Sequence, residues 1–494
     1  MPKPSSSSER PVLFVSDALI ERLAPSGAGI AVIDGLAVVV PGALPGARGA
    51  LRYRKPLPGG RQGLAESFEE ASPSPYADST RCALAGICGG CPFAGLAYEA
   101  ELRLKAKTLL EEALERRGLL RPGLLCEPIG QPAERRTRFR NKAVLYPAQD
   151  GSSRLGFFRT RSHEVVPVED CPLAPAWMAD TVRAAESLLA SGMLTPYDEA
   201  SQQGSLRALL LREGTTEDGG PGERLACFVL REAPEAAVKE AIRRAAAPLG
   251  LASLALNIHP EPGNAVLSFA PGAMQLLAGK PAIDAWIGSL VFEVSPDAFL
   301  QVNAVQTPVL YRTALDAIDL GPGDVLLDLC CGVGTMTLLG ARHAAAAIGI
   351  ESVPQAVACA RRNAARNGIR NAFFAASPAE AALPALLALS RGEAAAPDAH
   401  AALEEAFGGE RPQSWPLPTK AILDPAFKGL GEAALEALAA LPIEAAAYVA
   451  CGPEAFARDA ARLEALGFAL ERVQPVDMFP GACHIECVGV LRRR

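Results

Sequence analysis

The spacing of apolar and polar residues divides the chain into three regions. From Pro11 to about Ser74, short apolar runs separated by Gly and Pro predict four or five strands, which is typical of a small β-barrel. Residues 128–290 alternate strand-like and helical patterns and predict an α+β domain. From about residue 291, buried strands alternate with helices, which predicts a parallel sheet covered by helices in a Rossmann-like α/β domain.

The segments around these regions are less regular. Residues 1–10 are polar and predict a disordered leader, and residues 57–79 are rich in Gly, Ser and Pro and predict a linker. Residues 98–118 have a helical period that Gly118 would end. The Ala-rich residues 375–415 fit either a helical insertion or an irregular loop. We therefore expect a barrel over 11–74, a central domain over 75–290 and a third domain over 291–494.

Length and composition agree with a globular protein of several domains. The 494 residues predict about three domains, and 49% hydrophobic residues supply a large core. A charged fraction of 21% excludes a disordered chain. The net charge of -7 argues against binding nucleic acid by bulk charge but leaves room for a local basic groove. No signal-peptide core and no apolar run of membrane-spanning length is found, so we expect a cytoplasmic protein.

Four of the twelve cysteines form a pattern typical of a metal site. Cys82, Cys88 and Cys91 follow each other closely, and Cys171 stands alone about 80 residues later. Three clustered thiolates and one distant thiolate can hold either a [4Fe–4S] cluster or a zinc ion. Zinc sites usually pair their ligands two and two, so the spacing favours iron and sulfur. The alternative is a set of buried thiols without a ligand.

A glycine turn directly after a predicted strand is a candidate nucleoside site. Gly332 and Gly334 permit a tight turn and a close approach of the backbone to a ligand. Glu351 follows 23 residues after Asp328, at the end of the next strand, where a carboxylate can accept hydrogen bonds from ribose hydroxyls. Thr337 stands where a dinucleotide fingerprint has its third Gly, which favours S-adenosylmethionine over a pyrophosphate ligand. The alternative is a glycine turn of an ordinary α/β protein.

Two residues near the C-terminus are candidates for covalent and acid–base chemistry. Cys451 ends a predicted strand, and the carboxyl ends of strands face the crevice where open α/β sheets bind ligands. A thiolate there can act as a nucleophile. Glu486 lies among apolar neighbours just before the last strand and can act as a general base. A buried structural cysteine and a solvated glutamate are the alternatives.

Taken together, these motifs resemble the S-adenosylmethionine-dependent RNA 5-methyluridine methyltransferases, in their iron–sulfur-containing branch. The resemblance rests on stretches in one order along the chain: RCALAGICGGCPFAGLAYEAELRLK, RFRNKA, SPDAFLQVN, DLCCGVGTMTL, GIE, ILDPAFKGL, VACGPEAFARD and DMFPGACHIECVGVL. It implies an N-terminal barrel of the TRAM type, which is OB-like, then a central α+β domain and a class I methyltransferase domain. It covers about residues 11–104, 130–175 and 290–494.

The resemblance also implies roles for individual residues. Cys82, Cys88, Cys91 and Cys171 match the four ligands of a [4Fe–4S] cluster. The positions that match contacts to S-adenosyl-L-methionine are Gln301, Cys330, Thr335, Glu351 and Asp424. Cys451 matches a nucleophile that adds to carbon 6 of uracil, and Glu486 matches the base that removes the proton from carbon 5 after methyl transfer.

The chain departs from the family pattern at two places beside the expected nucleophile. The usual DPxR is Asp424-Pro-Ala-Phe427-Lys428, so an expected Arg is absent, and the ammonium of Lys428 cannot replace a bidentate guanidinium fork. The usual SCNP is Ala450-Cys451-Gly452-Pro453, which lacks a Ser and an Asn. These changes bear on rate and on substrate fit.

A basic segment is the candidate RNA contact. Residues 134–143 hold five basic side chains, and Phe139, Phe157 and Phe158 are candidates for stacking on bases. The alternative is a solvated charged face. The expected partner is transfer or ribosomal RNA, with no membrane and no obligate protein partner. Two other functions stay open: methylation of another RNA base or a small molecule, and a catalytically degenerate iron–sulfur protein that binds RNA.

Overall fold

The chain forms two compact units, which are described separately. The computed structural model describes residues 11–56, 60–78, 82–160, 162–408 and 417–494. The expected leader, residues 1–10, lies outside the described residues. The first unit runs up to Glu112 and also contains Phe479–His484, and the second contains Ala113–Met478 and Ile485–Arg494. The domain boundaries expected at residues 74 and 290 stay predictions.

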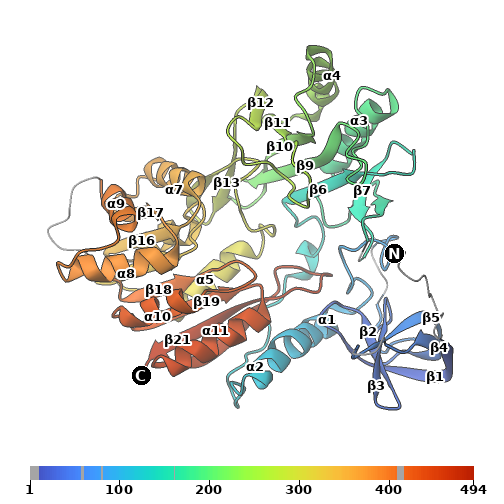
Figure 1. Cartoon of the computed structure of the whole chain (residues 1–494), viewed down its shortest axis with the longest axis horizontal. Helices are drawn as coiled ribbons and strands as arrows, with labels where there is room; N and C mark the ends of the chain where they lie inside the picture. The colour runs from blue at the N-terminus through green and yellow to red at the C-terminus, as the bar shows by residue number, and fades with distance from the viewer. Residues whose placement is uncertain (1–10, 57–59, 79–81, 161, 409–416) are drawn as a thin grey trace, which may run out of the picture. The chain divides into compact units, whose positions relative to one another are not determined.

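The first unit begins with a small closed barrel, as the sequence pattern predicts (Figure 1). Its strands are β1 (Val12–Leu23), β2 (Gly29–Ile33), β3 (Leu36–Val40), β4 (Arg48–Arg54) and β5 (Gly63–Ser72), in the order β1-β2-β3-β5-β4. Asp34 and Gly35 both have positive φ, 50° and 79°, and form the two-residue hairpin between β2 and β3. Alternate residues such as Ile20, Val38 and Leu51 fill the barrel core.

The expected linker over residues 57–79 is wrong in part, because β5 lies within it. β5 pairs with β4 along its length and with β3 at its start, so it closes the barrel. Its charged residues face outward, while Ala65 and Phe68 pack against the barrel core. Polar composition concealed a strand that buries only a few side chains.

The helical period over residues 98–118 is confirmed. It forms α1 (Tyr98–Lys105), a π-helical turn (Ala106–Glu111) and α2 (Glu112–Arg116), and Gly118 follows with φ of 68°. Within the first unit, Glu101 and Lys105 of α1 form a buried ion pair of 2.5 Å. Lys105 Nζ also donates to Phe479 O, and Glu101 Oε1 accepts from Gly481 N. These polar contacts fasten residues 479–484 to α1.

The second unit begins with a nine-stranded mixed sheet. Along its main path the order is β12-β11-β10-β9-β6-β7-β8. Off this path, β13 pairs with β9, and β14 pairs with β13. The strands are β6 (Lys142–Pro147), β7 (Leu155–Phe158), β8 (Val165–Pro167), β9 (Leu206–Thr215), β10 (Pro221–Leu230), β11 (Ser253–Ile258), β12 (Met274–Gly279), β13 (Ile283–Ile287) and β14 (Leu290–Val294).

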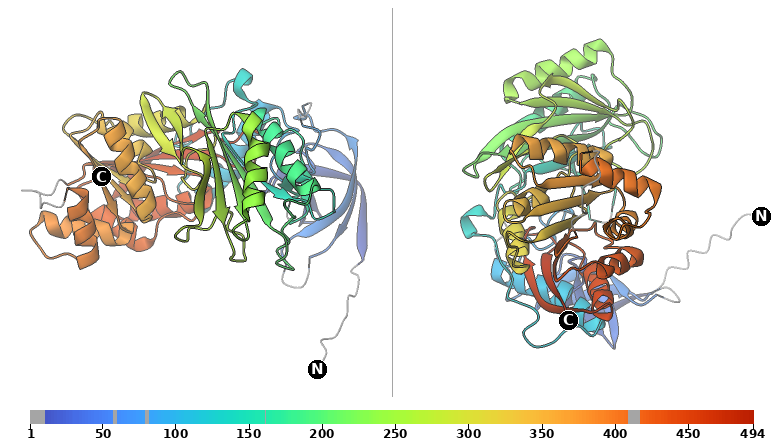
Figure 2. Two further views of the ribbon diagram at one scale, coloured as in Figure 1. Left: turned by 90° about the horizontal axis from the view of Figure 1, so that it is seen from above. Right: turned by 90° about the vertical axis from the view of Figure 1, so that its left-hand side faces the viewer.

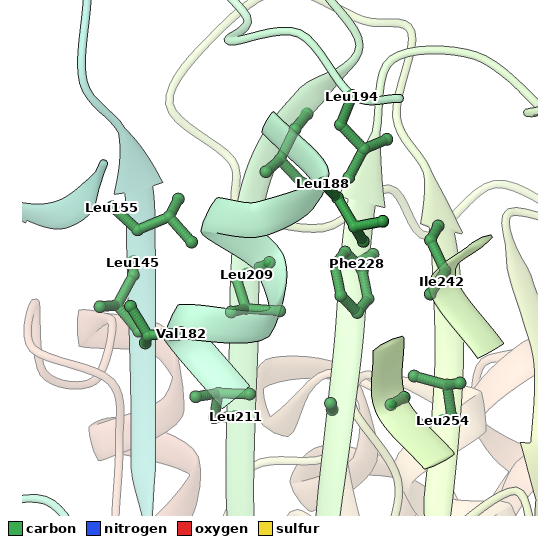
Figure 3. Close-up of a cluster of buried hydrophobic side chains, with 14 of the residues drawn as sticks. Leu145, Leu155, Val182, Leu188, Leu194, Leu209, Leu211, Phe228, Ile242 and Leu254 are labelled. Atoms are coloured by element: carbon green, nitrogen blue, oxygen red, sulfur yellow. The ribbon is translucent and has the colours of Figure 1, made fainter. Parts of the chain in front are cut away.

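Two helices, α3 (Trp177–Ala190) and α4 (Ala236–Ala246), cover one face of this sheet (Figure 2). Alternate residues of the strands point toward them, including Leu209, Leu211 and Phe228. They meet Leu188 and Ile242 of the helices in one apolar cluster (Figure 3). The period of two in the strands and the period of 3.6 in the helices therefore meet in a shared core.

The remainder of the second unit is an open seven-stranded sheet with the order β17-β16-β15-β18-β19-β21-β20. The strands are β15 (Val325–Leu329), β16 (Ala346–Glu351), β17 (Ala372–Ala376), β18 (Lys420–Leu423), β19 (Ala445–Ala450), β20 (Phe468–Val476) and β21 (Glu486–Arg493). β15 to β19 are parallel, and β21 runs antiparallel between β19 and β20. The chain winds outward from β15 in both directions, which creates a switch point between β15 and β18.

Helices cover this sheet as right-handed crossovers require. The helices are α5 (Thr307–Ala317), α6 (Thr335–Ala341), α7 (Pro354–Arg366), α8 (Ala379–Ser390), α9 (Pro397–Ala406), α10 (Glu432–Ala440) and α11 (Pro453–Ala465). α8, α10 and α11 pack side by side along one face (Figure 1). Most of the Ala-rich segment is thus helical, as α8 and α9. Among the described residues, no helix has the length and apolarity needed to cross a membrane.

Candidate active site

The ends of neighbouring strands bring most of the predicted site residues to one edge of the seven-stranded sheet. Cys330 follows β15, Asp424 follows β18 and Cys451 follows β19. The parallel pairing of these three strands places their carboxyl ends together. β21 runs the opposite way, so its first residue, Glu486, reaches the same edge.

The glycine turn after β15 leaves backbone open for a ligand. Gly332 has φ of 54°, and a Cβ there would meet no atom within 4 Å. Gly334 has φ of 85° and begins α6, where a Cβ would lie 3.0 Å from the ring of Phe374. Cys330 has φ of 63°, an uncommon conformation for a residue with a side chain. The turn combines a tight path with open space beside the Cα of Gly332.

Glu351 is held in place at the end of β16 beside this turn. Its Oε2 accepts a hydrogen bond from Gly332 N at 3.2 Å, and its Oε1 accepts from Val353 N at 2.9 Å and from Ser352 Oγ at 3.1 Å. The side chain is half-buried. This arrangement orients a carboxylate on the adjacent strand toward the turn.

Two buried groups near the turn were missed by the sequence analysis. Asp328 is fully buried, accepts from Thr337 Oγ1 at 2.5 Å through Oδ2, and leaves Oδ1 without a partner. Tyr311 of α5 is 3% exposed, and its hydroxyl lies 3.3 Å from Oγ1 of Thr335. No spacing in the sequence connects Tyr311, which lies in a helix of another segment, with the glycine turn.

Cys451 and Glu486 are brought together by strand register. Ala450 of β19 pairs with Cys487 of β21, so the next residue outward on each strand is Cys451 and Glu486 respectively. Cys451 is half-buried, and Glu486 is 3% exposed. A thiol with access to solvent therefore lies next to a carboxyl group that is almost closed off.

Burial and mutual charge keep these groups in their neutral forms. The pKa of the Cys451 thiol is raised to about 11, mainly by burial and further by the negative charges of Glu486 and Asp424. Burial and the charge of Asp424 raise the pKa of Glu486 to about 8, and burial and Asp328 raise that of Asp424 to about 7. Such shifted groups in one crevice are typical of a functional site.

The second thiol at this edge is less suited to nucleophilic chemistry. Burial, followed by the charge of Glu351, raises the pKa of Cys330 to about 12. A higher pKa leaves a smaller thiolate fraction at neutral pH. Of the two, Cys451 is therefore the better candidate nucleophile.

Gln301 lies in the connection between β14 and α5 and is buried. Asn141 Nδ2 donates to its backbone oxygen at 2.9 Å, which fixes the path of this segment. Two residues later, Asn303 Nδ2 donates to Met478 O at 3.0 Å. The expected contact of Gln301 with the methyl donor stays a prediction, as do the roles of the other site residues.

The predicted metal ligands belong to both units. Cys82, Cys88 and Cys91 are half-buried residues of the first unit, and Cys171 is a half-buried residue of the second. Among the described residues, no group of three or more His, Cys, Asp or Glu is arranged to hold a metal ion. The four-cysteine cluster stays a prediction.

The basic segment is more involved in structure than its sequence indicates. Arg138 forms a two-point ion pair with Asp170 and donates to two backbone carbonyls. Phe139 is 3% exposed, so its expected stacking role is wrong, and Phe158 already stacks on Tyr146. Lys142 keeps its charge in a buried setting, where burial and the neighbouring Arg212 lower its pKa to about 8.

The chain is similar to bacterial proteins over nearly its whole length. It is 32% identical to an uncharacterized RNA methyltransferase of Halalkalibacterium halodurans over 479 residues, which cover 97% of this chain and 96% of that protein. A similar protein of Gloeobacter violaceus is 32% identical over 96% of this chain and 95% of its own length. One of Listeria monocytogenes is 30% identical over 96% of both chains. No family model matches the chain.

A solved structure has the same fold. The crystal structure of a Pyrococcus abyssi tRNA (uracil-54, C5)-methyltransferase, in complex with S-adenosyl-L-homocysteine, aligns with a TM-score of 0.69 at 20% identity. The alignment covers 96% of this chain and all of that one. The likeness supports the fold: a small barrel and a Rossmann-like sheet in one chain.

The contacts at the sheet edge predict how Cys451 reacts with iodoacetamide. Alkylation at Cys451 should be slow at pH 7 and accelerate toward pH 11, because the thiolate is the reactive form. Glu486→Gln should accelerate it above pH 8, where the native carboxyl group is ionised and holds the thiol pKa up, and should change little below pH 7. Peptide mass spectrometry measures the rate.

The matched control is Glu471→Gln, which alters an exposed carboxylate paired with Arg492. It should leave the pH profile unchanged. An identical profile for Glu486→Gln and the native chain would contradict the electrostatic coupling of Cys451 and Glu486.

Proposed function

This chain belongs to the family of RNA methyltransferases, being 32% identical to one of them over 97% of its length, and we propose that it methylates carbon 5 of a uridine in RNA. The methyl donor is S-adenosyl-L-methionine, and the reaction passes through a covalent bond between Cys451 and carbon 6 of the base. The observation that carries the proposal is the pairing of β19 with β21, which sets the Cys451 thiol beside the Glu486 carboxyl group.

The residues around the glycine turn fit a nucleoside with a positively charged group. Glu351 offers a fixed carboxylate for ribose hydroxyls, and the space beside the Cα of Gly332 is open. Asp424 and the unpartnered Oδ1 of Asp328 favour a cation nearby. The donor supplies an activated methyl group on a sulfonium cation. Gln301, Cys330 and Thr335 are the further contacts that we assign to it.

The chemistry follows from the order in which the chain's groups gain and lose protons. Cys451 must first become a thiolate, since the thiolate is the nucleophile. Its addition to carbon 6 makes carbon 5 an enolate carbon that accepts the methyl group. Glu486 then removes the proton left on carbon 5, and the thiolate is expelled. A positioned base of this kind contributes about 10²- to 10⁴-fold to the rate.

The charges around Cys451 and Glu486 explain why these reaction steps would not begin before the methyl donor binds. At neutral pH the raised pKa values keep Cys451 as a thiol and Glu486 mostly protonated. A positive charge within a few ångströms lowers the pKa of both groups, because it favours their ionised forms. Donor binding would therefore precede nucleophilic attack.

RNA contacts are proposed for two parts of the chain. Lys142 keeps an ammonium group next to Arg212, and Arg140 of the same segment is half-buried, so both side chains are candidates for a phosphate contact. We further propose that the small barrel is of the TRAM type and adds a second contact, as barrels of this general kind often bind nucleic acid. Modification of transfer or ribosomal RNA would place the protein in the cytoplasm.

The test is the nucleoside product together with an adduct. Total transfer and ribosomal RNA from cells lacking the gene, incubated with the protein and S-adenosylmethionine, should gain 5-methyluridine by mass spectrometry. Cys451→Ala should abolish the product, because the other half-buried thiol at this edge, Cys330, has a higher pKa and therefore a smaller thiolate fraction. Glu486→Gln should accumulate a protein–RNA complex that survives denaturation, because the carbon 5 proton stays in place.

Cys126→Ala is the matched control, because Cys126 is a half-buried thiol of the same unit whose backbone bonds Val473 within β20, and it does not follow β15, β18 or β19. It should retain activity. Normal 5-methyluridine formation by Cys451→Ala would contradict the mechanism, and a different methylated nucleoside would contradict the choice of substrate.

We also propose that Cys82, Cys88, Cys91 and Cys171 hold a [4Fe–4S] cluster. The donor set supports it, since iron–sulfur clusters are bound by thiolates and all four side chains are half-buried rather than sealed. The residues after Cys82 and Cys91 form tight turns, as Ala85 N donates to Cys82 O and Ala94 N to Cys91 O. Cys82 and Cys91 therefore lie in turns rather than in helices.

Protein purified without oxygen should contain about four iron and four sulfide per chain if such a cluster is present. Cys171→Ala should lower both and weaken the visible absorption, whereas Cys126→Ala should not. Zinc in place of iron, with no sulfide, would contradict the cluster and favour the zinc alternative.

A further inference from the structure

The loop after β18 carries an exposed aromatic ring directly beside the candidate nucleophile. Phe427 is 63% exposed and stands where the family resemblance implies an Arg. If Gly452, the residue after Cys451, carried a Cβ, that atom would lie 2.5 Å from Phe427 O and 3.5 Å from Phe427 Cδ2. The loop therefore runs along the rim of the crevice that contains Cys451.

The same contact connects the two departures from the family pattern. Gly452 stands where the family has Asn, and any side chain there would collide with the backbone oxygen of Phe427. The backbone of Gly452 has φ of -112° and ψ of 89°, so its conformation does not require Gly, and the close approach does. Gly452, which replaces the Asn of the family pattern, and Phe427, which replaces its Arg, therefore contact each other beside Cys451.

The loop is fixed on the side away from the ring. Arg458 Nη2 donates to Lys428 O at 2.8 Å, and Asp459 Oδ2 accepts from Leu430 N at 2.7 Å. Asp459 is 1% exposed and also accepts from Tyr448 at 2.6 Å. Gly429 has φ of 76° and leaves no room for a Cβ beside Asp459 and Arg458. The ring of Phe427 is therefore presented to solvent from a rigid backbone.

We propose that Phe427 is a stacking platform for a base of the bound RNA strand next to the target uridine. This rests on the proposed function, since it takes RNA as the substrate. A flanking base fits better than the target, because Phe427 is exposed at the rim whereas Glu486, which must reach the target, is almost closed off. Every base has a π-face, so an aromatic ring can bind the strand without a particular sequence. Its rigid support lowers the ordering cost of binding.

The experiment measures binding of a twelve-nucleotide oligouridine by fluorescence anisotropy, without S-adenosylmethionine. Phe427→Ala should weaken binding about 5- to 150-fold, which corresponds to the loss of one stacked base. Phe427→Leu should weaken it about as much, whereas Phe427→Trp should bind like the native chain. Affinity for S-adenosylmethionine should not change in any of these variants.

Phe269→Ala is the matched control, because Phe269 is 68% exposed on the connection before β12, in the nine-stranded sheet. It should bind within about twofold of the native chain. Native-like binding by Phe427→Ala or Phe427→Leu would overturn the proposal. So would equal weakening by Phe269→Ala.

A second arm identifies which base is stacked. An RNA with a single uridine among adenosines, and with an abasic position on each side of that uridine, should bind the native chain and Phe427→Ala equally, and a persistent difference would overturn the choice of a flanking base. The outcome is separate from the uracil-methylation proposal. A stacking result with a product other than 5-methyluridine would contradict that proposal and leave the role of Phe427 standing.

Discussion

The antiparallel pairing of β21 with β19 is the constraint on which the site depends. In a purely parallel sheet, a residue at the start of a strand lies at the edge opposite to the carboxyl ends. β21 is reversed, so its first residue lies at the edge where the preceding parallel strands end. The register of Ala450 with Cys487 then brings Cys451 beside Glu486, which is 35 residues further along the chain. A shift by one residue would turn one of the two side chains to the other face.

The environment that the sheet creates determines the chemistry as much as the residues do. Glu486 and Asp424 are acids whose pKa values are raised mainly by burial. The charge of Asp424 further raises the pKa of Glu486, and the charge of Asp328 further raises the pKa of Asp424. Glu486 and Asp424 in turn raise the pKa of Cys451. A cationic donor bound beside these groups would lower the pKa values of the two acids and of the Cys451 thiol. It would thereby favour the thiolate, which is the nucleophile. The positive charge that binds the donor to the site would therefore also activate Cys451.

Much of the fold could be predicted because local patterns coincide with it. Buried strands with intervening helices predicted the Rossmann-like sheet, and strands with Gly-rich turns predicted the barrel. β5 was missed because its outward side chains are charged and few of its residues are buried. The position of Cys451 and Glu486 at one edge could be anticipated only through the family resemblance, since pairing across 35 residues leaves no periodic signal.

Long-range contacts explain the remaining differences. Arg138 was expected on an RNA-binding face, but its partner Asp170 lies 32 residues away and is invisible in the local sequence. Tyr311 reaches Thr335 only because α5 packs against the sheet. The contact between Phe427 and Gly452 likewise depends on two loops that end adjacent strands. Each of these residues is placed by tertiary packing rather than by the pattern around it.

The central claim is that the sulfur of Cys451 bonds to carbon 6 of the target base, and 5-fluorouridine in the substrate RNA tests it most directly. Fluorine replaces the proton that Glu486 must remove, so the reaction should stop after methyl transfer. A stable protein–RNA complex should form only with S-adenosylmethionine, and its cross-linked peptide should contain Cys451. Methylation of normal RNA without any such complex, or a bond to another residue, would contradict the claim.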